Sequence, residues 1–98
     1  MAVLVRNVMP NMTRQQYEEA SSKVLALVQK ERGFQLHVGF PAPNGGWAVS
    51  EIWDTAEDST RNFETNVVPN VPEGAFDDAT HEVIENVNVI AARSLIEQ

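Results

Sequence analysis

The chain has 98 residues, no cysteine and a formal net charge of −7. This length predicts a single domain over residues 1–98, and a content of 43% hydrophobic and 21% charged residues is typical of a globular protein. The acidic balance disfavours nucleic acid and anionic membranes as partners, and the lack of cysteine excludes disulfides and thiolate metal sites. No window is apolar enough to span a membrane and "MAVLVRN" lacks a basic leader, so we expect a cytoplasmic protein.

The first third of the chain predicts a strand followed by a helix. Residues 2–8, "AVLVRNV", are rich in β-branched side chains, which favours a strand. Thr13 and Gln16 form a T-x-x-Q capping box, so a helix should begin there. Gly33 should end it in the left-handed conformation. The apolar positions of this helix recur every three or four residues: Tyr17, Ala20, Val24, Leu27 and Val28.

The remainder predicts a hairpin, a second helix and a last strand. Residues 34–40 and 47–53 read as strands joined by the turn "PAPNGG". Asp54 or Thr55 should cap a helix that buries Ala56, Phe63 and Val67 and stops at Pro69. A loop over residues 69–80 and a strand over 81–90 follow. The order β-α-β-β-α-β predicts an α+β, ferredoxin-like fold: a four-stranded antiparallel sheet with two helices on one face.

The two faces of the predicted sheet differ in polarity. We expect the helices to cover the alternating apolar side chains of residues 34–40, together with Ala48, Ser50 and Ile52. The other face would then carry the polar residues of the hairpin and both tryptophans: Gln35, His37, Gly39, Trp47, Val49, Glu51 and Trp53. That face is too apolar to stay in water, so a second copy should cover it and enclose a lumen. A register slip of one residue would exchange the two faces.

The chain resembles the antibiotic-biosynthesis-monooxygenase-like family of dimeric α+β barrels. The resemblance rests on Gly33-Phe34 with His37, on Gly46-Trp47 with Val49 and Trp53, and on Phe63 before Pro69. It implies a homodimer whose subunits each have a hydrophobic cavity between sheet and helices. Characterised members of that family include cofactor-free oxygenases acting on aromatic polyketides and haem-degrading enzymes.

The resemblance also implies what haem chemistry would need, because haem-degrading members of that superfamily carry an Asn–Trp–His constellation. Asn7 matches the first member by position, but Phe63 stands where the tryptophan would be, and "ETNVVPNVPEG" after it contains no histidine. The resemblance therefore disfavours haem chemistry.

His37 and Glu51 are the candidate catalytic residues. A histidine titrates near neutral pH, and a carboxylate beside two tryptophans can have a raised pKa, so the two could form an acid–base couple. The structural alternatives are a histidine satisfied at a dimer contact and a glutamate that is paired with Arg6 or lies at the barrel mouth. The candidate substrate-binding residues are Asn7, Gln35, Trp47, Trp53 and Phe63.

Two functions of different classes remain open at this stage. The first is a cofactor-independent monooxygenase-like enzyme that acts on a small aromatic or polyketide-like substrate, with His37 or Glu51 as the base. The alternative is a non-catalytic dimeric protein that binds a small apolar or aromatic molecule. No metal is expected from the spacing of the histidines and carboxylates, and no nucleotide motif indicates a cofactor.

Overall fold

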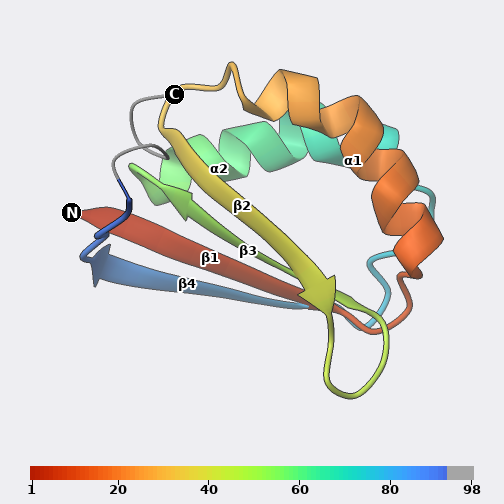
Figure 1. The fold of residues 1–98 in the computed structure, drawn as a ribbon. Coiled ribbons are helices and arrows are strands. Elements are labelled where there is room, and N and C mark those ends of the chain that lie inside the picture. Colours follow the sequence, from red (N-terminus) through yellow and green to blue (C-terminus); the bar gives the residue numbers. More distant parts are fainter. Residues whose placement is uncertain (93–98) are drawn as a thin grey trace.

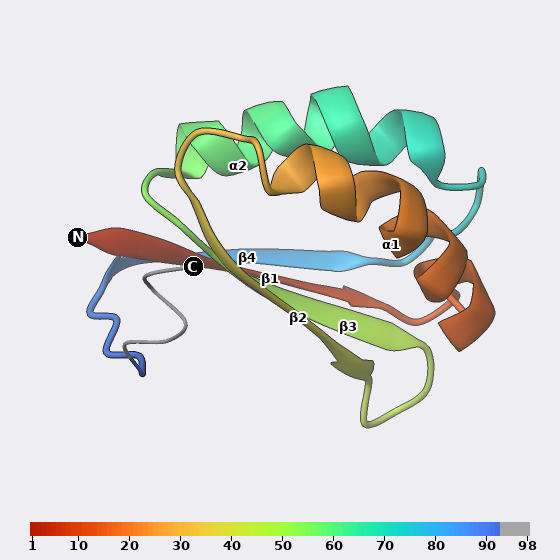
Figure 2. The same cartoon turned by 45° about the horizontal axis from the view of Figure 1, so that its top comes forward.

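The computed structural model describes residues 1–92 and has the predicted ferredoxin-like order of elements. The elements are β1 (Ala2–Met9), α1 (Arg14–Val28), β2 (Phe34–Pro41), β3 (Trp47–Trp53), α2 (Ala56–Asn62), η1 (Phe63–Val67), η2 (Val68–Asn70) and β4 (Thr80–Val87). The four strands form one antiparallel sheet in the order β2-β3-β1-β4. Both helices lie on the same face of this sheet and leave the other face open (Figures 1 and 2).

The first helix begins where its capping box predicts. Thr13 Oγ1 accepts from the backbone N–H of Gln16, and the Gln16 side chain accepts from the Thr13 N–H. The regular helix ends earlier than predicted, at Val28, and a turn leads to Gly33, which has the expected positive φ of 85°. Leu27 was expected on the buried side and is instead 42% exposed, so the contact with the sheet runs through the other predicted positions.

The hairpin has the predicted strands, but the predicted assignment of its faces is wrong. The pairing of β2 with β3 shifts between Phe34 and Leu36, so Gln35 occupies a β-bulge. Phe34 therefore packs edge-on against Trp53 beneath the helices, with ring centroids 5.4 Å apart. Trp53 is 0% exposed, so its face is the one that the helices of the same chain cover.

The uncovered face carries the side chains that we had expected under the helices. Leu36 pairs with Ile52, and Val38 pairs with Ser50, on the opposite side of the sheet from the tryptophans. Leu36 is 39% exposed and Val38 is 46% exposed. The open face thus carries exposed apolar side chains beside the Arg6–Glu82 ion pair, and neither tryptophan.

The second helix begins as predicted and continues further. Thr55 Oγ1 accepts from the Asp58 N–H and caps α2. The helical path then passes through the wider turn η1 and the tighter turn η2, so the chain leaves the helix after Asn70 and not at Pro69. The buried residues of this segment are polar, contrary to the expectation of a buried Ala56, Phe63 and Val67: they are Asp58, Ser59, Asn62 and Asn66.

The last strand ends at Val87 instead of Ile90. Asn86 has a positive φ of 58°, and the pairing of β1 with β4 shifts between Ala2 and Leu4, so the ladder is irregular at this end.

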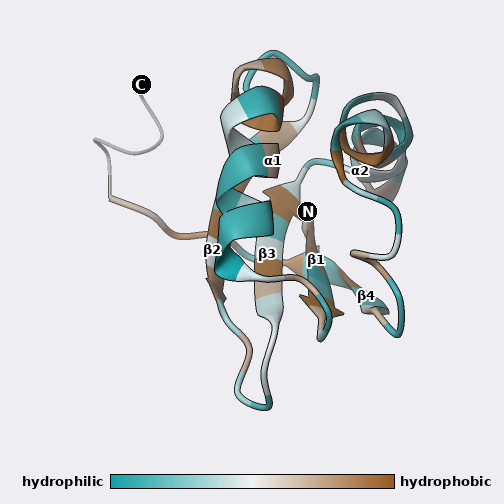
Figure 3. Cartoon of the chain, turned by 90° about the vertical axis from the view of Figure 1, so that its right-hand side faces the viewer, coloured by the Kyte–Doolittle hydropathy of each residue, from teal (hydrophilic) through white to brown (hydrophobic). Residues whose placement is uncertain are grey.

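Figure 3 looks along the sheet and shows α1 on the β2 and β3 side and α2 on the β1 and β4 side. Two apolar clusters fill part of the space beneath them, one around Trp53 and Val5 and one around Met9 and Val49.

Candidate active site

A cavity of about 340 Å³ lies between the sheet and the two helices. Its lining is mostly apolar and includes members of both core clusters, such as Val5, Val28, Met9 and Val49. A volume of this size suits a small organic molecule, and an apolar wall with a few polar groups is typical of ligand sites. Besides the hydroxyls of Ser21, Ser59 and Thr60, the lining contains three groups of polar side chains.

The first polar group is a chain of hydrogen bonds that we call the relay, formed by Tyr17, His37, Glu51 and Trp53. Tyr17 Oη lies 2.6 Å from His37 Nε2, and His37 Nδ1 lies 2.6 Å from Glu51 Oε2. Trp53 Nε1 donates to Glu51 Oε1 over 3.0 Å. Because the carboxylate can only accept, Nδ1 of His37 carries a proton, and in the neutral imidazole Nε2 then accepts from the Tyr17 hydroxyl.

Strand pairing places the relay. His37 on β2 and Glu51 on β3 are direct partners in the ladder, so their side chains lie next to each other on the face beneath the helices. Trp53 follows Glu51 by two residues and points to the same side. Tyr17 reaches down from α1, with its ring 5.9 Å from the His37 ring and 5.2 Å from the Trp47 ring.

Gly39 makes this approach of Tyr17 possible. A Cβ at position 39 would overlap the hydroxyl and the Cζ atom of Tyr17 and lie 3.0 Å from its Cε1 atom. The glycine therefore leaves the space that the phenol ring occupies beside His37.

The environment favours the protonated form of the tyrosine. Burial raises the pKa of Tyr17 above its ordinary 10.0, and the nearby negative charge of Glu51 raises it further. At neutral pH the hydroxyl is thus intact and can donate to His37.

The second polar group joins β1 to β4. His81 Nδ1 lies 2.6 Å from Asn7 Oδ1, and the two residues are ladder partners. With the amide oxygen as acceptor, Nδ1 of His81 carries the proton. Both residues line the cavity.

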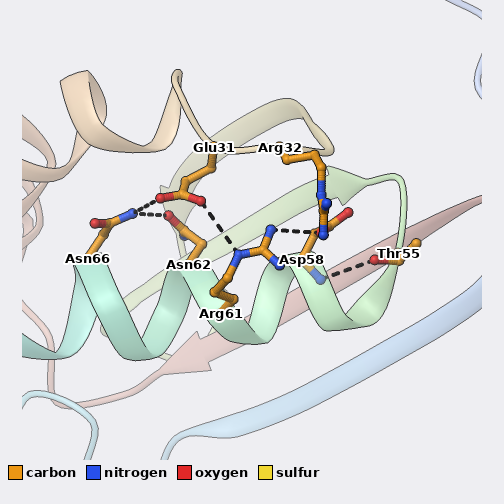
Figure 4. A network of polar contacts seen from close by, with 7 residues as sticks. All are labelled: Glu31, Arg32, Thr55, Asp58, Arg61, Asn62 and Asn66. Atoms are coloured by element: carbon orange, nitrogen blue, oxygen red, sulfur yellow. Dashed lines mark hydrogen bonds and ion pairs between the residues drawn. The ribbon is translucent and has the colours of Figure 1, made fainter.

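The third polar group is Asn62 on α2, which is 2% exposed and lines the cavity. Asn66 sets the orientation of the Asn62 side chain. Asn66 Nδ2 donates to Glu31 Oε1 over 3.0 Å and to Asn62 Oδ1 over 2.9 Å (Figure 4). Glu31 can only accept, so the atom of Asn66 that faces it is the nitrogen, and the atom of Asn62 that receives the second bond is the oxygen. The Nδ2 group of Asn62 is left to donate elsewhere.

An ion-pair cluster ties α2 to the end of α1 beside Asn62. Arg61 Nη2 lies 2.8 Å from Asp58 Oδ1, and Arg32 Nε lies 3.5 Å from the same oxygen (Figure 4). The hydrogen bond from Arg61 holds the pKa of Asp58 below its ordinary 3.8, against the opposing effect of burial. Gly33 leaves room for this carboxylate, which a Cβ at position 33 would overlap.

The residues predicted for the site divide into two sets. His37, Glu51, Asn7 and Phe63 line the cavity. The alternative pairing of Glu51 with Arg6 is wrong, because Arg6 pairs with Glu82 at 2.7 Å.

The other predicted residues lie outside the lining. Gln35 is exposed in the bulge and donates to Asp54 over 2.8 Å. Trp53 lies behind Glu51, and Trp47 packs against Tyr17 with an Nε1 atom that is buried without a hydrogen-bond partner among residues 1–92. These three side chains are therefore placed to support the cavity and not to contact a ligand in it.

Tyr17, Asn62 and His81 line the cavity but were not predicted as site residues. Tyr17 was assigned to an apolar helix face, and Asn62 was not singled out. The glycine at position 39 within an otherwise bulky strand was a signal, since such a glycine often marks the close approach of another group.

Within residues 1–92, no three histidine or carboxylate side chains gather closely enough to hold a metal ion. No helix of the same range is long and apolar enough to cross a membrane.

Comparisons with protein-family models and with curated proteins each found no match. Solved structures do match. SnoaB, a cofactor-independent oxygenase from Streptomyces nogalater, aligns with a TM-score of 0.62 at 11% identity, over 93% of this chain and 97% of that one. A dimeric ferredoxin-like protein of unknown function from a Jannaschia species aligns with a TM-score of 0.60 at 10% identity, over 87% and 99%.

A protein from Deinococcus radiodurans, provisionally assigned as an antibiotic biosynthesis monooxygenase, aligns with a TM-score of 0.54 at 12% identity, over 94% and 98%. At these identities the comparisons establish the fold. The resemblance drawn from the sequence is confirmed at that level.

Proposed function

We propose that the protein is a cofactor-independent monooxygenase-like enzyme that oxidises a small aromatic or polyketide-like substrate. The observation that carries the proposal is the His37–Glu51 pair, held at 2.6 Å inside a largely apolar cavity of about 340 Å³. A base inside a dry, apolar site is what deprotonation of a weak carbon or oxygen acid requires.

The chemistry that fits is oxidation of a substrate that forms a stabilised carbanion. The base removes a proton, and the carbanion transfers an electron to molecular oxygen and combines with the reduced oxygen to give a peroxide. The peroxide takes up a proton and loses water, so one oxygen atom remains in the product as a carbonyl and the other leaves as water. Asn62 Nδ2 is placed to stabilise the enolate oxygen of the carbanion by donating a hydrogen bond.

The structural neighbours support this choice of reaction over other base-catalysed ones. One of them is named as a cofactor-independent oxygenase and another carries a provisional monooxygenase assignment. We place the enzyme in the cytoplasm, in keeping with the expectation from its sequence.

Oxygen uptake with a dihydroxyanthrone as substrate tests the proposal, with the uncatalysed reaction subtracted. We expect the parent protein to convert it to the quinone, and His37→Gln and Glu51→Gln to lower kcat by roughly 100- to 10,000-fold. The matched control is Glu18→Gln, which removes an exposed carboxylate of α1 and should leave the rate unchanged. Variants as fast as the parent would show that the pair is not the base. Tight binding without oxygen uptake would favour the non-catalytic binding protein.

We also propose that the protein is a homodimer joined through the open face of the sheet. Leu36, Val38 and Ile84 are each at least 39% exposed there, and Ile52 and Leu4 join Leu36 to Ile84 across the sheet. Exposed apolar surface of this kind often marks an interface. The structural neighbour named as dimeric supports a dimeric state. Val38→Glu would place a charge in the interface and should convert the dimer to a monomer in sedimentation, whereas Ser22→Glu on the exposed side of α1 should not. A parent protein that sediments as a monomer at micromolar concentration would contradict the proposal.

A further inference from the structure

We propose that Tyr17 is the catalytic residue that exchanges the proton with the ligand, with His37 and Glu51 behind it as the acceptor pair. The ligand class that follows is a molecule with an ionisable hydroxyl or enol oxygen directed at α1. This inference rests on the proposed function and names the contact through which the base acts.

The hydrogen bonds of His37 leave it no free nitrogen. Nδ1 donates to Glu51 and Nε2 accepts from Tyr17, both over 2.6 Å. Each oxygen of Glu51 accepts one bond, from His37 and from Trp53, and the carboxylate has no proton of its own to pass on. A ligand that approached a nitrogen of His37 directly would first have to break one of the two bonds of the imidazole.

Tyr17 is the member of the relay that can pass on a proton and still accept another from the cavity. A hydroxyl has one proton and two lone pairs. The proton of Tyr17 is given to His37 Nε2, which leaves lone pairs that can accept from a ligand hydroxyl. The residue lines the cavity from α1, opposite the sheet that carries His37 and Glu51.

The transfer is a two-proton shift in which the tyrosine is neutral before and after. The ligand O–H bond breaks as a bond from that proton to Tyr17 Oη forms. The original Tyr17 O–H bond breaks as the bond to His37 Nε2 forms. The electron pair stays on the ligand oxygen, and the new imidazolium lies against the Glu51 carboxylate. The raised pKa of Tyr17 is compatible with this route, because no free tyrosinate accumulates.

Two residues of the sheet fix the position of the Tyr17 ring. Gly39 leaves the space for its ring, and Trp47 packs on the ring with centroids 5.2 Å apart. Four titratable side chains line the cavity within residues 1–92, and three belong to the relay. The fourth is His81 on β4, which donates to Asn7.

Para-nitrophenol is the probe, because its free pKa lies near neutrality and its phenolate form is coloured. When the dye binds to the parent protein, the hydroxyl of the dye should pass a proton to the relay. The apparent pKa of the bound dye should therefore fall by about one unit or more, a tenfold change in ionisation. Tyr17→Phe keeps the ring and removes the hydroxyl, and should return the apparent pKa to the free value. Ser22→Ala removes an exposed hydroxyl from the same helix and should retain the shift.

Three results would overturn the inference. The first is a parent protein that does not bind the dye or binds it without a shift. The second is a shift that persists in Tyr17→Phe and disappears in His37→Gln, since the histidine would then contact the ligand itself. The third is a shift that persists in Tyr17→Phe and disappears in His81→Gln. A Tyr17-dependent shift in a protein that takes up no oxygen with the anthrone would support the relay and count against the monooxygenase reaction alone.

Discussion

Gly39→Ala is the substitution that tests the geometry of the relay most sharply. A methyl carbon at position 39 would lie 3.0 Å from Tyr17 Cε1 and closer still to Cζ and the hydroxyl. Carbon atoms pack at about 3.5–4.0 Å, so the ring must retreat by about 1 Å. The hydrogen bond from Tyr17 to His37, now 2.6 Å, would then stretch to about 3.6 Å, beyond the range of a hydrogen bond.

The expected loss of kcat is about 100-fold, the effect of a 1 Å misplacement of a reacting group. The free energy of unfolding should fall by up to about 2.6 kcal/mol, because overpacking costs about 1–3 kcal/mol and the stiffer unfolded chain returns about 0.4–1 kcal/mol. The assay is oxygen uptake in a double-mutant cycle with Tyr17→Phe. If Gly39→Ala acts through the hydroxyl, it should cost almost nothing in the Tyr17→Phe background. Full activity of Gly39→Ala, or additive losses in the double variant, would refute the reasoning.

Three further substitutions test the supports of the site. Trp53→Phe removes the donor to Glu51 Oε1 and should lower the free energy of unfolding by about 1–3 kcal/mol together with kcat; an unchanged kcat would contradict a positioning role. Asn66→Ala removes the donor to Asn62 and Glu31, and should cost about 1–3 kcal/mol in urea unfolding; a smaller loss would show that the bonds are dispensable. Asp58 has a lowered pKa, so its stabilisation is present at neutral pH and lost as pH falls through the folded-state pKa. Asp58→Asn should therefore be less stable near neutrality, with a melting temperature that depends less on pH below about 4.

The order of the elements could be predicted because local signals fix it. The capping box at Thr13 and the polar turn between the hairpin strands act over a few residues, and each leads to an element where it was expected. The end of α2 was harder to predict, since Pro69 fits in the tighter turn η2 and does not stop the chain there.

The covered face of the sheet could not be predicted, because both faces combine apolar with polar side chains. Alternation assigned Phe34 to the side of Leu36 and Val38, and the bulge at Gln35 breaks that alternation by one residue. The choice of face is made by tertiary packing, in which the large Trp53 fits beneath the helices.

The pairing of His37 with Glu51 on one face was predicted and is confirmed, although the face lies under the helices. Tyr17 was missed because its contact with His37 joins a helix to a strand, and no local pattern reports such a contact. Asn62 was missed because a buried face made of hydrogen-bonded polar residues has no hydrophobic period to reveal it.

The measurement that tests the central claim most directly is the location of a bound hydroxyanthraquinone by nuclear Overhauser contacts. A ligand held between the sheet and the helices of the same chain should show contacts to the Tyr17 ring and to the methyl groups of Val5 and Val49. Contacts to the methyl groups of Val38 and Ile84 instead would place the ligand on the open face, and the relay would then have no part in binding it.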